Sequence, residues 1–220
     1  MGGVALTLTI AWPLLSHVPG WAGGTVAADQ EPLAVGQMLA KFAAGSVPDS
    51  EATRLLASGE SASHALDAFV EELSAMLDVP LFVRQITSGR ELVLEIERSR
   101  ALETVADRLR NSPDVLNVRI DRVAGTQRYW MDRLLLEPAP GSELGRAASL
   151  ASEARAAEAV RRQLAVQFPH PHYVLAARVD SQQQVTLRID LKATAMNLIK
   201  ALRALIGVEY AQPNFIATVN

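Results

Sequence analysis

The 220-residue chain contains no cysteine, so disulfides, thiolate metal ligands and thiol nucleophiles are all excluded. Its net charge of −3 supplies no basic field for a phosphate backbone, and we therefore expect no nucleic-acid partner. Aromatic residues make up only 5% of the chain, whereas the hydrophobic fraction of 49% is ordinary for a globular protein. These values predict a folded protein without thiol chemistry.

Catalytic and metal-binding motifs are also missing. The sequence has no Gly-x-Ser-x-Gly elbow, no phosphate-binding glycine loop and no His-Glu-x-x-His. The loop His170-Pro171-His172 has no third ligand nearby, whereas a metal site needs three or four. Glu95, Glu97 and Asp190 alternate with apolar residues, which favours a solvated strand face over an acid–base pair. We therefore expect no enzymatic activity, no catalytic residue, no metal and no cofactor.

The first 28 residues resemble a secretory signal peptide, although no lysine or arginine occurs in the first 40 residues. Val4–Leu15 is an apolar stretch, and Val26-Ala27-Ala28 supplies the small residues that precede a cleavage site. The alternatives are a disordered tail or a membrane anchor, for which the stretch is too short and contains Pro13. We expect residues 1–28 to be removed during export, leaving a secreted or periplasmic protein without a membrane span.

One sequence pattern occurs twice in the chain. Pro80–Arg110 aligns without a gap with Tyr173–Arg203, at an offset of 93 residues, and further upstream the offset is 92. A repeated unit of about 90 residues is too long for a solenoid repeat and has the size of a small domain. The sequence therefore predicts two related domains, at residues 33–123 and 127–220.

Hydrophobic periodicity predicts the elements of each copy. Apolar residues at helical spacing indicate a helix near 63–78 and another over Leu102–Leu109, and period-two alternation at Leu92–Glu97 is typical of a half-buried strand. The expected strand, helix, strand, strand, helix and strand lie at 35–43, 63–78, 80–87, 92–97, 102–109 and 115–123, then at 128–136, 146–168, 173–180, 185–190, 194–205 and 207–219. Two βαβ halves joined by a hairpin form a four-stranded antiparallel sheet with two helices on one face. The predicted fold class is therefore α+β, with two tandem ferredoxin-like βαββαβ domains.

The two faces of each predicted sheet should have different neighbours. We expect the helix stripes Leu102–Leu109 and Leu198–Leu202 to be buried against the strands of their own copies. On the other face, Pro80–Ile86 and Tyr173–Val179 carry apolar residues in both alternating sets. An exposed apolar face must meet a partner protein or the sister domain.

The end of the chain carries a short pattern of its own. A helix is followed by a glycine turn at Gly207, the strand motif Val208-Glu209-Tyr210, and a proline flanked by Gln212 and Asn214. This ending resembles the close of the propeptide domains of subtilisin-like serine proteases, the peptidase-inhibitor propeptide family. Met38–Phe42 similarly resembles the opening strand of that family. The resemblance covers essentially all of the second copy and most of the first, and it implies the same βαββαβ fold.

The resemblance implies a free-standing prodomain that binds a subtilisin-like serine protease in trans, as an inhibitor, a folding chaperone or both. The open sheet face would pack on the protease, and the C-terminal segment would lie in the substrate cleft as an added strand. The implied binding residues are Tyr210, Gln212, Asn214, Phe215, Ile216, Ala217, Thr218, Val219 and Asn220. Gln212 and Asn214 stand where the family often has acidic residues, which weakens capping of the protease's helix ends. The alternative is an exported protein-interaction or structural module with no protease target.

Overall fold

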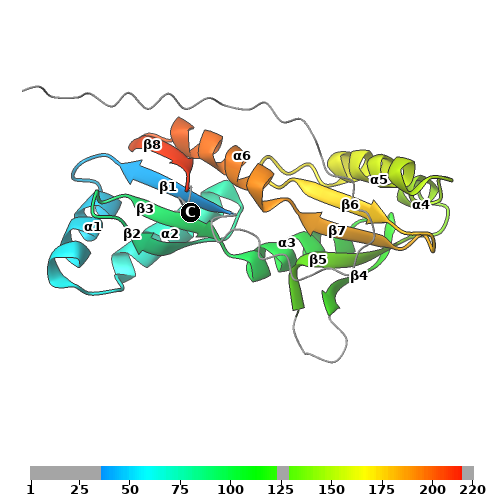
Figure 1. Cartoon of the computed structure of the whole chain (residues 1–220), viewed down its shortest axis with the longest axis horizontal. Coiled ribbons are helices and arrows are strands. Elements are labelled where there is room, and N and C mark those ends of the chain that lie inside the picture. The colour runs from blue at the N-terminus through cyan, green and yellow to red at the C-terminus, as the bar shows by residue number, and fades with distance from the viewer. Residues whose placement is uncertain (1–35, 123–128, 215–220) are drawn as a thin grey trace, which may run out of the picture. The chain divides into compact units, whose positions relative to one another are not determined.

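The structure is a computed structural model that describes residues 36–122 and 129–214 (Figure 1). It is an α+β protein, as predicted, with two four-stranded antiparallel sheets and six helices in the described residues. The strands are β1 (Gln37–Phe42), β2 (Leu81–Ile86), β3 (Leu92–Ile96), β4 (Val115–Arg122), β5 (Tyr129–Pro138), β6 (Leu175–Val179), β7 (Val185–Ile189) and β8 (Val208–Pro213). The helices are α1 (Val47–Ser58), α2 (His64–Leu77), α3 (Arg98–Arg110), α4 (Glu143–Ala148), α5 (Glu153–Gln167) and α6 (Leu191–Ala204). The leader predicted at residues 1–28 lies outside the described residues.

Each sheet takes one edge strand from the other sequence copy. Sheet A has the strand order β2-β3-β1-β8, and sheet B has the order β4-β5-β7-β6. Strand β8, from the end of the second copy, therefore lies beside β1, and β4 of the first copy lies beside β5 (Figure 1). We expected each copy to build its own sheet; instead, both sheets combine strands from 33–123 and 127–220.

The exchange is reciprocal and preserves the strand register. Ala40 of β1 lies opposite Ala211 of β8, and Leu136 of β5 lies opposite Val118 of β4. Val118 and Ala211 are separated by the same offset as the aligned repeat, so the exchanged strands fill equivalent positions in the two sheets. This arrangement is a strand swap within one chain.

The junction between the copies provides a local cause for the exchange. Strand β4 ends at Arg122, which lies opposite Tyr129 at the start of β5, so the two strands pair as a hairpin. Pairing of strands that are close in sequence costs little loop-closure entropy. Once β4 is paired with β5 it is not available to β1, and β8 fills the vacant edge of sheet A.

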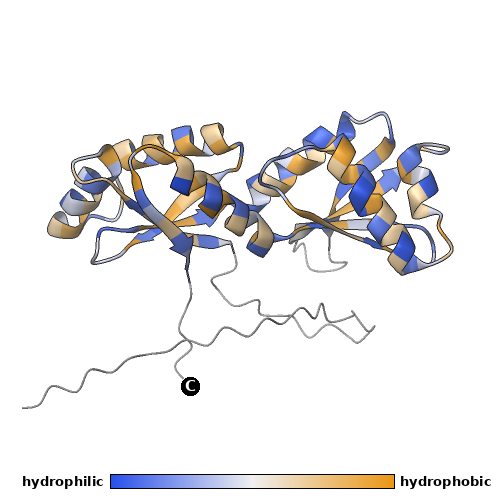
Figure 2. Ribbon diagram, turned by 90° about the horizontal axis from the view of Figure 1, so that it is seen from above, coloured by the Kyte–Doolittle hydropathy of each residue, from blue (hydrophilic) through white to orange (hydrophobic). Residues whose placement is uncertain are grey.

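The helices lie on one face of each sheet (Figure 2). Helix α3 packs against β4 and β5, whereas α6 packs against β8 and β1. Each of these helices therefore accompanies the exchanged strand that follows it. Helix α2 packs on β2 and α5 packs on β6, so each sheet is covered by helices from both copies.

The helix stripes predicted to be buried are buried. Each member of both stripes is at most 1% exposed: Leu102, Val105, Leu109, Leu198, Ile199 and Leu202. We expected these stripes to pack against the hairpin strands of their own copies, β3 and β7; instead, α3 packs mainly against β4 and β5, and α6 packs mainly against β8 and β1. Burial follows from the apolar periodicity of each helix, whereas the choice of sheet follows from the strand exchange.

Two helices differ from the sequence-based expectation. Helix α1 was not predicted; it has Pro48 in its first turn, and its C-cap is Gly59, whose φ of 73° favours glycine. The single helix expected over 146–168 is divided into α4 and α5. Ser142 caps the start of α4 by accepting a hydrogen bond from the Gly145 N–H at 2.9 Å, and Ser152 occupies the N-cap position of α5.

Candidate functional site

The residues predicted to bind a protease begin in a paired strand. Tyr210 and Gln212 lie in β8, opposite Lys41 and Leu39 of β1, and both are exposed. Phe215, Ile216, Ala217, Thr218, Val219 and Asn220 lie outside the described residues. The described part of the predicted tail is therefore an edge strand of sheet A, attached to strands of the first copy.

Asn214, the last described residue, is bonded to the start of β1. Its backbone N–H donates to the Gln37 carbonyl at 3.2 Å, and its side-chain Nδ2 donates to Gln37 Oε1 at 2.8 Å. Gln37 Nε2 in turn donates to Glu95 Oε2 at 2.8 Å. These bonds connect the end of β8 to β1 and β3 at one corner of the sheet.

Tyr210 connects the exchanged strand to the β2–β3 hairpin. Its hydroxyl donates to Glu91 Oε1, and Thr87 Oγ1 donates to Glu91 Oε2. Hydrogen bonds from Thr87 and then Tyr210 hold the pKa of Glu91 below its ordinary value, and the bond to Glu91 raises the pKa of Tyr210. Lys41 Nζ donates to the Gly89 carbonyl in the same hairpin turn. A residue that the sequence assigned to protease binding therefore also holds sheet A together.

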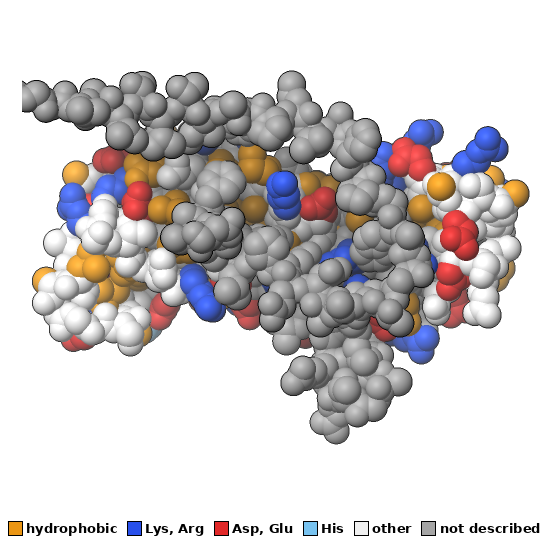
Figure 3. Space-filling model, viewed as in Figure 1, with side chains coloured by type: hydrophobic (Ala, Val, Ile, Leu, Met, Phe, Trp, Pro, Cys, Tyr) orange, Lys and Arg blue, Asp and Glu red, His pale blue; other side chains and the backbone are white. Residues whose placement is uncertain are grey.

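The face of sheet A opposite the helices is mixed in character. Residues that lie opposite one another in the ladders share a face. By this register the face carries Gln37, Leu39, Lys41, Phe82, Gln85, Val93, Glu95, Tyr210 and Gln212. Where grey atoms do not cover this part of the protein, Figure 3 shows hydrophobic side chains interspersed with charged ones. Val93 is buried, so the predicted apolar surface is reduced to the partly exposed Leu39 and Phe82 among polar residues.

The corresponding face of sheet B is rich in arginine. Arg133 of β5 lies directly opposite Arg188 of β7, at the position that Gln37 and Glu95 occupy in sheet A. Register also places Arg119 and Arg178 on this face. Arg133, Arg178 and Arg188 each make a polar or electrostatic contact within the chain, so they are not free cations. The duplicated sheets therefore present chemically different surfaces.

His170 joins the α5–β6 connection to the equivalent α2–β2 connection of the first copy. Its Nδ1 accepts hydrogen bonds from the backbone N–H groups of His172, at 3.1 Å, and Tyr173, at 2.9 Å. A ring nitrogen that accepts carries no proton, so we assign the proton to Nε2. Nε2 then donates to Asp78, whose carbonyl lies at 3.1 Å and whose Oδ2 lies at 3.2 Å. Both ring nitrogens of His170 are therefore engaged in hydrogen bonds, so neither is available to bind a metal ion.

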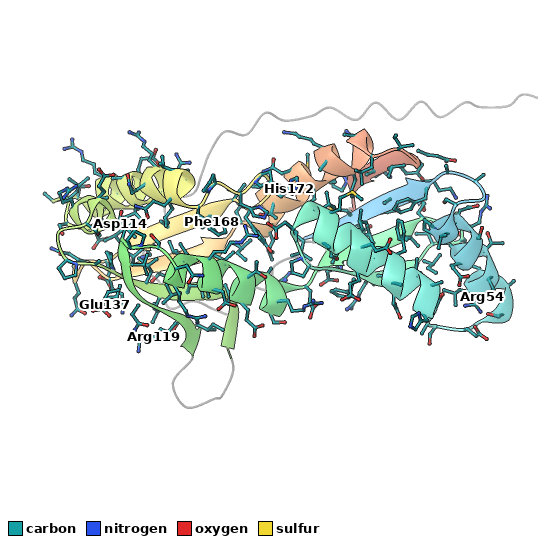
Figure 4. The ribbon with its side chains drawn as sticks, turned by 180° about the vertical axis from the view of Figure 1, so that it is seen from behind. Arg54, Asp114, Arg119, Glu137, Phe168 and His172 are labelled. Carbon is teal, nitrogen blue, oxygen red and sulfur yellow. The ribbon has the colours of Figure 1, made fainter. Side chains whose placement is uncertain are left out.

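Aromatic and charged groups surround this contact. Arg108 Nη2 donates to the Asp78 carboxylate, and the Arg108 guanidinium lies 5.7 Å from the centre of the Phe168 ring. Burial works against ionisation of Asp78, but Arg108 and His170 together lower its pKa. Burial lowers the pKa of His170 and raises that of Tyr173, whose ring lies 4.4 Å from the His170 ring. Figure 4 labels Phe168 and His172 in this connection. The cluster fastens the two copies to each other.

The carboxylates singled out in the sequence have separate structural roles. Asp190 Oδ1 caps α6 by accepting from the Ala193 N–H at 2.9 Å. Glu97 precedes α3 and forms an ion pair with Arg100 at 3.2 Å. Across residues 36–122 and 129–214, no group of three or more His, Asp or Glu could hold a metal ion. Within the same ranges, no helix is both long and apolar enough to cross a membrane.

A groove of about 460 Å³ is lined by α2, the edge strand β2 and the first turns of α3. Its lining includes Asp67, Glu71 and Ala75 of α2, together with Phe82 and Val83 of β2. This α2–β2 groove has the size of a ligand pocket. Sequence reasoning missed it, because no motif distinguishes an edge strand from a central strand before the strand order is known.

Known proteins provide no assignment for these surfaces. The chain matches no protein-family model, no curated protein and no solved structure. Any function must therefore be argued from the geometry above.

Proposed function

We propose that this protein is a non-enzymatic, exported binding protein that resembles a subtilisin prodomain and acts on a subtilisin-like serine protease as inhibitor, folding chaperone or both. In this proposal each sheet with its helices is a ferredoxin-like unit whose last helix and strand have been exchanged. The protease would dock on the open face of sheet A, and residues 215–220 would enter its substrate cleft. Sheet A, rather than a sheet formed by the second copy alone, is the docking unit.

The pair of hydrogen bonds between Asn214 and Gln37 is the observation that carries this proposal. These bonds hold the last described residue at the corner of sheet A, next to the Gln37–Glu95 pair on its open face. A segment that extends a strand from a fixed point loses less conformational freedom on binding than a free peptide does. Main-chain pairing of an extended segment with an enzyme cleft is a recurring mode of peptide recognition.

The surface beside this corner is suited to a protein partner. Leu39 and Phe82, both partly exposed, supply apolar area on the open face, and polar groups surround them. Protein interfaces commonly have an apolar centre with a polar rim. Pro213 precedes Asn214 and disfavours a helix at this point, which supports an extended course for the segment that binds.

The test measures inhibition of a panel of subtilisin-like proteases by the full chain and by a chain that lacks residues 215–220. We expect the full chain to inhibit at least one protease and the shortened chain to lose most of that inhibition. Refolding yields of the same proteases, synthesised without their prodomains, measure the chaperone role. Absence of binding by both chains, or equal inhibition by both, would overturn the tail mechanism.

A matched pair of variants tests the docking face. Leu39→Lys places a charge on the open face of sheet A, whereas Leu56→Lys places the same charge on an exposed position of α1. We expect only Leu39→Lys to weaken protease binding, with circular dichroism confirming that both variants fold. Equal effects of the two substitutions would favour the alternative, an interaction or structural module with no protease target.

A further inference from the structure

Strand β2 presents unpaired main-chain groups at the edge of sheet A. The Glu97 N–H donates to the Pro80 carbonyl at 2.9 Å, so Pro80 and Glu97 form a hydrogen-bonded pair of the ladder. Such pairs alternate with non-hydrogen-bonded pairs along antiparallel strands. Leu81 and Val83 therefore direct their N–H and C=O groups away from β3, toward the outer side of the strand.

The outward groups of Leu81 are already engaged by Ser74 of α2. Ser74 Oγ accepts a hydrogen bond from the Leu81 N–H at 2.9 Å, and the same hydroxyl donates to the Leu81 carbonyl at 3.5 Å. Val83 lies two residues farther along, where β2 lines the α2–β2 groove. Beyond it a register irregularity between Val83 and Gln85 interrupts the ladder. The place for an additional strand is therefore centred on Val83.

Helix α2 supplies the opposite wall of the groove and its charge. Asp67 and Glu71 are exposed, line the groove, and lie four residues apart on one face of the helix. Side chains at this spacing are about 5–6 Å apart at Cβ. Alternate residues of an extended peptide are about 6.6–6.8 Å apart and point the same way. Two basic side chains at positions i and i+2 of a bound strand therefore match these two carboxylates.

The other charged residues of the groove do not cancel the negative charge of Asp67 and Glu71. Glu97 and Arg100, at the start of α3, also line the groove and form an ion pair with each other. Asp78, another lining residue, is paired with Arg108. The groove thus combines an open strand edge with a wall whose uncompensated charge is negative.

We propose that the α2–β2 groove binds an extended segment of a partner protein that carries Arg or Lys at alternate positions. The segment adds to sheet A as a strand beside β2, pairing with the main chain of Val83 and directing its basic side chains toward Asp67 and Glu71. This site lies on a different edge of the sheet from β8, and it does not depend on the protease proposal.

The probe is the acetylated and amidated peptide Val-Arg-Val-Arg-Val, titrated into the full ¹⁵N-labelled chain and followed by NMR. We expect saturable shifts of the amide of Val83 and of amides along α2. Val-Glu-Val-Glu-Val should bind at least about tenfold more weakly, because its charges oppose the groove wall. A Val-Arg-Val-Arg-Val peptide that is N-methylated at every residue should also lose about tenfold in affinity if main-chain pairing contributes. The arginines must be included, because the residue directly opposite Val83 in an antiparallel ladder shares its helix-facing side.

Adjacent glutamates of α2 give a matched control. Glu71→Lys changes a groove residue, whereas Glu72→Lys makes the same change at an exposed position that does not line the groove. We expect Glu71→Lys to weaken the arginine peptide about tenfold and Glu72→Lys to leave its affinity within about twofold.

Several results would overturn the proposal. These are equal binding of the two peptides, equal effects of the two lysine variants, or shifts confined to residues outside β2 and α2. Binding that survives N-methylation would indicate a purely electrostatic contact and reject strand addition. A dimer that pairs through β2 in the absence of peptide would identify a second copy of this chain as the occupant instead. Protease inhibition is measured separately, so either proposal can fail without the other.

Discussion

His170 donates a hydrogen bond to Asp78 across the two copies of the repeat, joining equivalent connections that lie 92 residues apart. The His170 side chain is only 1% exposed, and its other ring nitrogen accepts two backbone N–H groups. A proton added at Nδ1 would displace both of those bonds and place a charge in a desolvated site. The contact between the copies therefore depends on the neutral form of His170.

The free energy of unfolding should consequently decrease in mildly acidic solution. Burial keeps the folded-state pKa of His170 below its ordinary value of 6.5, so at pH values below 6.5 the unfolded chain binds more protons than the folded chain. The His170 contribution is fully present above pH 6.5 and is lost as the pH falls toward the folded-state pKa. Urea denaturation at a series of pH values between 8 and about 5 measures this dependence.

Two substitutions separate His170 from other titrating groups. His170→Gln should flatten the pH dependence in this range, although His172, whose pKa is also lowered by burial, leaves a residual slope of the same sign. His64→Gln, at an exposed position at the start of α2, should keep the wild-type dependence. Identical profiles for wild type and His170→Gln would show that His170 does not titrate as argued.

The strand exchange can be tested with engineered disulfides, because the chain has no cysteine of its own. Ala40 of β1 and Ala211 of β8 are buried and lie opposite each other. Asn214 and Gln37 form a hydrogen-bonded pair of the same ladder, so the alternation of pairs makes Ala40 and Ala211 a non-hydrogen-bonded pair. Such pairs bring Cα atoms to about 4.5 Å, within reach of a disulfide. The double variant Ala40→Cys/Ala211→Cys should therefore cross-link under mild oxidation, as measured by mass spectrometry and gel mobility.

The matched control uses the strand that β1 would meet without exchange. Val118 fills the position in sheet B that Ala211 fills in sheet A, so two self-contained domains would place Val118 opposite Ala40. Ala40→Cys/Val118→Cys should not cross-link within the monomer. The reverse outcome, with a bond from position 40 to 118 and none to 211, would establish tandem domains without exchange.

Sequence periodicity could predict the elements but not this exchange. The stripe Leu102–Leu109 and the alternation in Leu92–Ile96 are local signals, and both correspond to the observed helix and strand. The partner of β1 could not be predicted in this way, because β4, with Val118, and β8, with Ala211, are equivalent strands that fit the edge of β1 in the same register. The β4–β5 hairpin decides between the two candidates, because it removes β4 from competition for β1. The hydrophobic pattern carries no information about such a competition between strand pairings. The α2–β2 groove was missed for the same reason, since it exists only once β2 is known to be an edge strand.

Core substitutions should be costly in both sheets. Leu94 and Leu187 are fully buried in β3 and β7. Leu94→Ala or Leu187→Ala should lower the free energy of unfolding by about 2–5 kcal/mol, through lost apolar burial and the cavity that remains. Met76→Ala, at a side chain that is 66% exposed, should stay within about 0.5 kcal/mol of wild type. Chemical denaturation measures all three, and wild-type stability of both leucine variants would contradict the assigned core.

Arg203 should protect the outer edge of sheet A from self-association. Its Nε donates at 2.7 Å to the carbonyl of Ala211, which points away from β1 because Ala40 and Ala211 form a non-hydrogen-bonded pair. An exposed strand edge is a template for pairing with another chain, and a charged side chain over that edge opposes such pairing. Arg203→Ala should therefore lower the free energy of unfolding by about 1–2 kcal/mol and increase dimer formation in sedimentation-velocity experiments. Lys200→Ala removes an exposed cation from the same helix, and it should change neither quantity. If Arg203→Ala remains as monomeric as Lys200→Ala at high concentration, the edge of β8 is protected by something other than Arg203.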